Sequence, residues 1–467
     1  MKKAYFILAA IMALTGCMVG PDYRKPEIAT PAAYKEAGDW KVAQPQDDAS
    51  RGHWWEIYAD ADLNSLVSQV EISNQNIAAA AASYRQAQSL LGVAQGSYFP
   101  TLTGSVSGSR GAIGSSGTAV AGTPIHNSVR PSLSASWEPD LWGQIGRNVE
   151  ASKASVQASN ADLGNALLSA QATLVQSYFQ LRVDDVEKQL LDQTSVAYER
   201  SLQITKNQYE AGMVGRVDVV QAEAQLKTTQ AQAIDLGVQR AQLEHAIAVL
   251  IGKAPTDFQI KPTYALPALP QIPAALPSEL LERRPDIASA ERRVEMTNAQ
   301  VGVAQAAFFP SLTLSGSYGY QSSGLSQLLT APNSFWSLGP TFAMTLFNGG
   351  ALSAQKQAAL AVNDNSVAMY RQAVLAAFQE VEDNLAALHQ LADESAVQQA
   401  AEKLAGEAQE LTENQYKAGT VSYLNVVSTQ ASALNARRTS LNIAGRRLAA
   451  NAVLVKALGG DWQKAMK

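Results

Sequence analysis

The sequence feature that most constrains the fold is an abrupt change of periodicity that occurs twice. The segment VAQGSYFPTLT (93–103) reads as a helix up to its Phe-Pro pair and as an alternating strand after it, with no loop between. The segment VAQAAFFPSLT (303–313) repeats this pattern closely. Proline denies a helix one backbone N–H, so each helix ends where the alternation begins. The sequence therefore predicts two helix-to-strand junctions of the same kind.

A second pair of matching segments indicates that the junctions belong to a tandem duplication. NQYEAGMVGRVDVV (207–220) matches NQYKAGTVSYLNVV (414–427), in the same order and at nearly the same offset as the junctions. A repeat of about 200 residues is far longer than the units of solenoid proteins. We therefore expect two halves with one plan, each consisting of a helix, two strands and a long helical hairpin.

This plan assigns a range to every part of the chain. The first repeat spans 58–252 and opens with a single helix over about 58–96. Its strands are expected at 98–108 and 128–138, and its hairpin tip at 211–217. The second repeat is predicted over 285–457, with strands at 310–320 and 334–347 and a tip at 418–422. A proline-rich linker, 253–284, separates the repeats, and 458–467 is a C-terminal tail.

The four predicted strands carry apolar residues on one face and small hydroxyl residues on the other. Their length is close to the 9 to 11 residues or so that cross a bilayer as a tilted strand. A soluble sandwich is the alternative, but its outer face would be expected to carry charges rather than hydroxyls. Open strand edges are excluded from lipid, and four strands cannot close a barrel. Three copies of the chain would supply twelve strands.

The N-terminus predicts export and lipidation. Lys2 and Lys3 precede a short apolar run, which is typical of a signal peptide over 1–16 rather than of a membrane-spanning helix. Leu14-Thr15-Gly16-Cys17 resembles a lipobox, so we expect a covalent lipid on Cys17, the only cysteine. Met18 stands where an inner-membrane retention signal would have Asp, which favours the outer membrane.

Composition and motifs exclude several classes of function. Charged residues make up 16% of the chain and the net charge is −5, which argues against nucleic acid as a partner. The four histidines show no metal-ligand spacing, and no nucleotide-binding, metalloprotease or serine-hydrolase motif is present. We therefore expect no enzyme, no metal site and no cofactor apart from the lipid on Cys17.

The ordered set of motifs resembles the TolC-like outer-membrane factors, and within them the NodT-type efflux lipoproteins. The resemblance rests on GPDYRKP (20–26) after the lipobox, LLERRPDI (280–287), the paired FFP or YFP junctions and the paired QYxAG turns. It implies a membrane α+β fold, in which a homotrimer forms a 12-stranded β-barrel continuous with a 12-helix periplasmic α-barrel. Residues 17–57, the linker and the C-terminal tail would form an equatorial belt.

The resemblance also implies a role for the chain and for its hairpin tips. The trimer would be the passive exit duct of a tripartite pump for drugs, metals or other toxic compounds. Its partners would be a periplasmic adaptor and an inner-membrane transporter of the RND type. Gate positions are carried over to Asp218, Tyr416, Val421 and Asn425. Adaptor-docking positions are carried over to Gly212, Met213, Val214, Gly419 and Thr420.

At three positions the sequence departs from some relatives of this family. An Arg is replaced by Val421, and two Asp residues are replaced by Asn425 and Ser428. The chain therefore lacks that tip ion pair and part of an acidic ring, which leaves apolar contacts or hydrogen bonds of Tyr416 to hold the tip closed. Asp218 itself has two readings, a gate charge or a favourable charge at a helix N-terminus.

Two other functions remain open at this point. A duct for type I-like protein secretion would have the same architecture, although the lipobox favours efflux. A lipid-anchored structural tether between envelope layers is a function of a different class, and the four alternating strands argue against it.

Overall fold

The computed structural model describes residues 18–31, 33–37, 51–112, 125–270 and 283–460. The expected signal peptide and Cys17 lie outside the described residues, as does the tail beyond residue 460. The chain divides into two compact units, and each unit takes segments from both sequence repeats. The first unit contains Ser83–Ser159 and Ser289–Tyr370 with the N-terminal stretch through Glu27, and the second contains the remaining segments.

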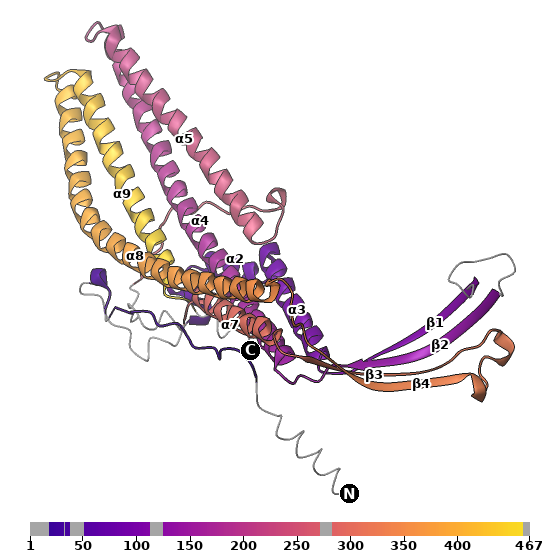
Figure 1. The fold of residues 1–467 in the computed structure, drawn as a ribbon. Coiled ribbons are helices and arrows are strands. Elements are labelled where there is room, and N and C mark those ends of the chain that lie inside the picture. The colour runs from indigo at the N-terminus through magenta and orange to yellow at the C-terminus, as the bar shows by residue number, and fades with distance from the viewer. Residues whose placement is uncertain (1–17, 32, 38–50, 113–124, 271–282, 461–467) are drawn as a thin grey trace. The chain divides into compact units, whose positions relative to one another are not determined.

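The first unit carries one antiparallel sheet in the order β1-β2-β3-β4 (Figure 1). Its strands are β1 (Thr101–Ala112), β2 (Ile125–Trp137), β3 (Ser311–Tyr320) and β4 (Ser334–Ala343). The sheet joins the two repeats, because β2 pairs with β3 and places Leu133 opposite Tyr318. The strands start or end a few residues away from the expected positions. Tyr98 and Phe99 lie in the turn before β1, and β4 ends at Ala343 rather than at 347.

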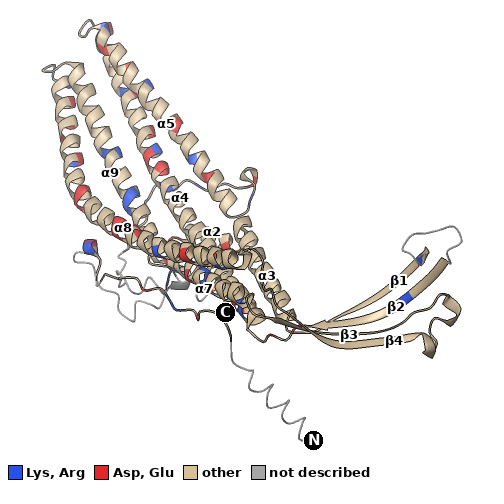
Figure 2. Cartoon of the chain, viewed as in Figure 1, with Lys and Arg blue, Asp and Glu red and all other residues tan. Residues whose placement is uncertain are grey.

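The pairing register places apolar side chains of all four strands on one face. Leu102 lies opposite Ala135, Tyr318 opposite Trp336, and Leu312 opposite Phe342. Hydroxyl groups line the other face, where the Oγ atoms of Ser317 and Ser337 are 2.8 Å apart. Figure 2 shows how few charged residues the strands contain: Arg110 in β1 and Arg130 in β2 are the only ones.

Both predicted helix-to-strand junctions form, but the expectation of no loop is wrong, because a four-residue turn, 97–100 or 307–310, separates each helix from its strand. The helix α3 (Gln75–Gly96) closes with a bond from Phe99 N to Gly96 O, and α7 (Pro285–Ala306) closes with a bond from Phe309 N to Ala306 O. The proline that follows each phenylalanine ends the helix, and the strand begins one residue later. Carbonyl groups freed near the junctions accept bonds from tryptophans, at 2.9 Å from Trp137 to Tyr98 O and at 2.6 Å from Trp142 to Pro310 O.

The segment that follows Met18 is held against the helices of the first unit. Arg147, which is 1% exposed, donates to the carbonyls of Val19 and Gly20 and pairs with Asp22 at 2.9 Å. Gly20 has φ +105, and a Cβ there would lie 2.5 Å from Gly302 Cα in α7. The GPDY motif therefore fits a close backbone approach and a buried arginine.

The second unit contains two helical hairpins. They are formed by α4 (Gln144–Glu210) with α5 (Arg216–Leu250), and by α8 (Ala351–Lys417) with α9 (Tyr423–Ala457). Part of α4 and part of α8 belong to the first unit. Within the described residues, no helix is both long enough and apolar enough to span a membrane.

The single helix expected over 58–96 is wrong, because the chain forms a 3-10 turn, η3 (Arg51–Tyr58), and then two helices, α2 (Ala61–Ser73) and α3. The break lies at Asn74, which is extended (ψ 123). Its side-chain oxygen accepts from the N–H of Asn76 and Ile77, so it caps α3. Its amide donates to Leu250 O at 2.7 Å. A contact distant in sequence thus stabilises the cap.

In the core of the second unit, aromatic residues from the N-terminal segment pack against α4. Trp54, Trp55 and Tyr58 are buried with Phe179, whose ring meets that of Tyr58 at 4.8 Å. The linker lies against the same region, because Arg182 donates to Lys261 O and Arg240 donates to Ile260 O. Asp185, buried between the two arginines, pairs with both.

Candidate functional site at the hairpin tips

Two turns with the same geometry form the hairpin tips, which we define as 211–215 and 418–422. In the first tip, Met213 N bonds to Gln208 O and Gly212 N bonds to Tyr209 O. In the second tip, Thr420 N bonds to Gln415 O and Gly419 N bonds to Tyr416 O. This paired pattern is a Schellman cap, which requires a left-handed residue. Gly212 (φ +75) and Gly419 (φ +73) supply it, which explains the repeated Ala-Gly of both QYxAG motifs.

An apolar cluster lies just behind the tips and joins the two hairpins. Tyr198, Leu202 and Leu226 of the first hairpin pack with Tyr423 and Val426 of the second. Tyr416 packs on the edge of this cluster, with its ring centroid 5.3 Å from that of Tyr423. The two hairpins are thus held together near the tips by side chains that water does not reach.

A hydrogen bond also joins the two hairpins beside this apolar cluster. The hydroxyl of Tyr416 donates to Gln208 Oε1 at 2.6 Å. Burial raises the pKa of the Tyr416 hydroxyl, the hydroxyl of Thr205 lowers it, and the charge of Asp218 adds a smaller increase. Tyr416 therefore stays protonated and keeps its donor near neutral pH. The described chain thus contains an apolar contact and a hydrogen bond of Tyr416 at this level. Whether either holds the tip closed stays a prediction.

The structure brings together some of the predicted site residues and leaves others apart. Asp218 lies in the first turn of α5, half-buried and close enough to Tyr416 to act on it electrostatically. Val421 is half-buried and Asn425 is exposed at the start of α9. The predicted docking residues lie on the tips themselves: Gly212, Met213, Gly419 and Thr420 are exposed and Val214 is half-buried.

Sequence reasoning missed Gln208, the acceptor of the bond from Tyr416. The signal was present, because Gln208 and Tyr209 occupy the same places in the first QYxAG motif as Gln415 and Tyr416 do in the second. Tyr209 is exposed, whereas Tyr416 packs between the hairpins. The two copies of the motif therefore share a backbone turn and differ in what their side chains do.

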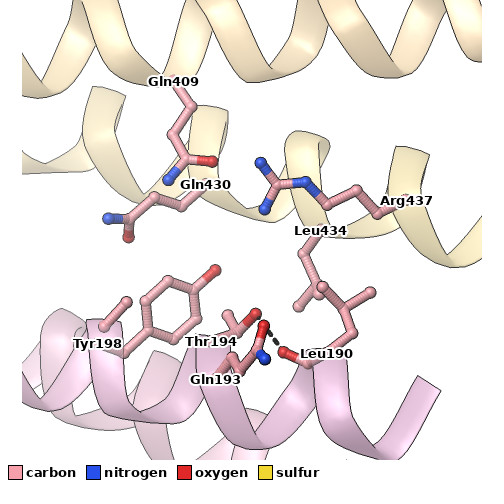
Figure 3. A pocket seen from close by; sticks show the side chains of 9 residues that line it. Leu190, Gln193, Thr194, Tyr198, Gln409, Gln430, Leu434 and Arg437 are labelled. Atoms are coloured by element: carbon pink, nitrogen blue, oxygen red, sulfur yellow. Dashed lines mark hydrogen bonds between the residues drawn. The ribbon is translucent and has the colours of Figure 1, made fainter. Parts of the chain in front are cut away.

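A cavity of about 140 Å³ lies farther from the tips, between α4 of the first hairpin and α8 and α9 of the second (Figure 3). Its lining mixes apolar and polar side chains, and residues of both hairpins contribute to it. Nothing in the sequence singled out this cavity. The described residues contain no group of three or more His, Cys, Asp or Glu side chains that could hold a metal ion.

A chain that combines two capped helical hairpins with a four-stranded sheet, apolar on one face, has the features of an outer-membrane channel subunit. The chain belongs to the outer membrane efflux protein family, whose model matches residues 66–253 and 276–460. These ranges cover most of both repeats, and they leave out part of the proline-rich linker.

Individual relatives match the chain over nearly its whole length. The pyoverdine export outer membrane protein OpmQ of Pseudomonas aeruginosa is 30% identical, over 99% of this chain and 97% of its own. The toluene efflux pump outer membrane protein TtgI of Pseudomonas putida is also 30% identical, over 99% of both chains. The solved outer-membrane channel OprN is 30% identical, with a TM-score of 0.88 over 96% of this chain and all of its own. The protein is thus an outer-membrane efflux duct that extends into the periplasm.

Proposed function

We propose that three copies of the chain assemble into the exit duct of a tripartite efflux pump. The observation that supports this most directly is the sheet, in which β1 and β4 are edges that the described chain leaves unpaired. Lipid cannot satisfy the N–H and C=O groups of open edges, so the sheet must pair with other copies to enter the membrane. Three sheets would give twelve strands, and three pairs of hairpins would give a twelve-helix tunnel.

The exposed apolar face supports the same assembly. Val106, Leu338 and Trp336 are each more than 70% exposed, although they are large and apolar. In a closed barrel this face would contact lipid, and the hydroxyl face would line water. The described residues contain no candidate metal site, and we propose a passive duct rather than an enzyme.

The assembly is tested on full-length protein extracted from outer membranes in detergent. We expect an oligomer of three chains that falls apart on heating, and ohmic conductance when it is inserted in planar bilayers. A monomer without conductance would exclude the duct and would favour the alternative of a lipid-anchored tether. Pores of another stoichiometry would overturn the trimer while leaving the channel in place.

The partners proposed are a periplasmic adaptor, which docks on the exposed tip residues, and an inner-membrane transporter, which supplies the energy. The relatives that match carry names referring to pyoverdine and to toluene, so the family does not assign one cargo to this chain. Small toxic compounds remain the proposed cargo, and secretion of proteins is the alternative. A deletion strain tested against solvents, drugs and metal salts would distinguish them, because a protein-secretion duct would leave these susceptibilities unchanged.

Lipidation of Cys17 remains part of the proposal, together with cleavage of 1–16. The described segment from Met18 to Asp22 is fixed by Arg147, so a lipid on the residue before it would anchor the first unit directly. Incorporation of labelled palmitate into the wild type, and its loss in Cys17→Ser, would support this. Equal labelling of the two proteins would contradict it.

A further inference from the structure

The cavity of about 140 Å³ between the two hairpins has a lining of both polar and apolar side chains. A water molecule needs only about 10 to 15 Å³ of such space, so the cavity can hold a small organic molecule. It lies between two apolar clusters, since Tyr198 belongs to the cluster near the tips and Leu434 to a second cluster with Leu191. Apolar packing thus flanks the cavity along the seam.

One end of the cavity carries a positive charge without a partner. The guanidinium of Arg437 points into the cavity from α9 (Figure 3), and it forms no hydrogen bond or ion pair within the described part of the chain. Tyr198 faces it from α4. The hydroxyl of Tyr198 points toward the same space in Figure 3, and both side chains line the cavity. These groups offer several N–H and O–H donors to an anion.

The other end offers an acceptor. Gln430 is only 5% exposed, and its Oε1 has no hydrogen-bond partner. Its Nε2 is already committed to Glu413 at 3.0 Å, as is the Nε2 of Gln409 at 2.9 Å. Because Nε2 is fixed in this way, the unpaired oxygen is left to face the cavity. A buried acceptor without a donor destabilises the protein by roughly 1 to 3 kcal/mol, so a ligand N–H there would be favoured.

We propose that this cavity binds a small zwitterion, a molecule with a carboxylate and an N–H donor, such as a free amino acid. The carboxylate lies at Arg437 and the hydroxyl of Tyr198. The ammonium lies at Gln430 Oε1, on the side where Glu413 provides a negative charge. Such a ligand contacts α4, α8 and α9 together, and it therefore holds the two hairpins in their present arrangement. The site does not depend on pore formation.

The test uses the full-length protein in detergent and three probes of similar size. L-Serine carries both groups, glycine betaine has a carboxylate but no N–H, and ethanolamine has an ammonium but no carboxylate. We expect saturable calorimetric binding of L-serine at one site per chain and a raised melting temperature. Each of the other probes should bind about tenfold more weakly or worse, because each loses one charged hydrogen bond.

Variants locate the site. Arg437→Gln and Gln430→Leu should each weaken L-serine binding about tenfold or more, whereas Arg446→Gln, at an exposed arginine of the same helix, should not change it. The proposal is overturned if the wild type does not bind L-serine saturably, if glycine betaine binds equally well, or if the cavity variants bind as the wild type does. Conductance measurements play no part, so failure of the duct proposal would leave this result standing.

Discussion

At the scale of single residues, the hydrogen bond between Tyr416 and Gln208 is the most direct candidate for holding the tips closed. We expect Tyr416→Phe to raise single-channel conductance, because the substitution removes the donor and keeps the ring in its apolar contacts. Tyr209→Phe is the matched control, since Tyr209 is the equivalent residue of the first repeat and is exposed. Equal conductance of Tyr416→Phe and wild type in planar bilayers would reject this bond as a latch.

The buried carboxyl of Asp184 should make the stability of the folded protein depend on pH. Burial is the main cause that raises the pKa of its carboxyl from 3.8 to about 6, the bond from Gln180 acts against it, and Glu187 and Asp185 add to the increase. Its Oδ2 has no hydrogen-bond partner. Because the folded state binds the proton more tightly than the unfolded state, stability falls as pH rises from about 4 to about 6 and stays lower above that.

Asp184→Asn should remove this loss. We expect a higher melting temperature than wild type at pH 7.5, equivalent to a gain on the order of 2 to 3 kcal/mol, and little difference near pH 4. Asp192→Asn is the control, because Asp192 lies on the same helix, is exposed and pairs with the exposed Lys188. Thermal melts of the three proteins across the pH range test this prediction. A gain in melting temperature that is independent of pH would show that ionisation of Asp184 is not its cause.

At the scale of elements, the turns and junctions were predictable because short local segments specify them. Each Phe-Pro pair ends a helix by removing a donor, and each Ala-Gly provides a left-handed cap, whatever packs around them. The break at Asn74 was not predictable, because its cap is stabilised by Leu250 O, far away in the sequence. The same holds for the cavity, since its lining depends on which hairpin face meets which. The repeated QYxAG motif marked the position of Gln208, but not that Tyr416 would donate to it.

The left-handed glycines allow a test of the tip geometry. Gly212→Ala and Gly419→Ala should each destabilise the protein by about 1 to 2 kcal/mol, because a Cβ is unfavourable at positive φ. Gly237→Ala is the control with the opposite sign. Gly237 lies inside α5, and a Cβ added there would meet nothing within 4 Å, so alanine should stabilise its helix by about 1 kcal/mol. Denaturant melts measure the change in the free energy of unfolding. A change of the same sign in all three variants would contradict the left-handed role of the tip glycines.

At the scale of the whole molecule, the sheet and the hairpins favour opposite environments, one apolar and the other aqueous. The sheet exposes a broad apolar face, whereas the hairpins carry most of the charged residues (Figure 2). A single chain cannot satisfy both in water, whereas the assembly proposed above would. In that assembly, the internal duplication lets each chain supply two similar pairs of strands and two similar hairpins.

The assignment of the two sheet faces can be tested on adjacent residues of β4. Leu338→Arg should reduce the yield of heat-sensitive oligomer in the outer membrane, because an arginine facing lipid near the middle of a strand costs about 2 to 4 kcal/mol. Ser337→Arg should assemble normally, because Ser337 lies on the hydroxyl face opposite Ser317, which would line water. Gel electrophoresis of unheated outer-membrane extracts measures the yield. Normal assembly of Leu338→Arg together with loss of oligomer in Ser337→Arg would reverse the assignment of the faces. Normal assembly of both variants would show that neither face meets lipid.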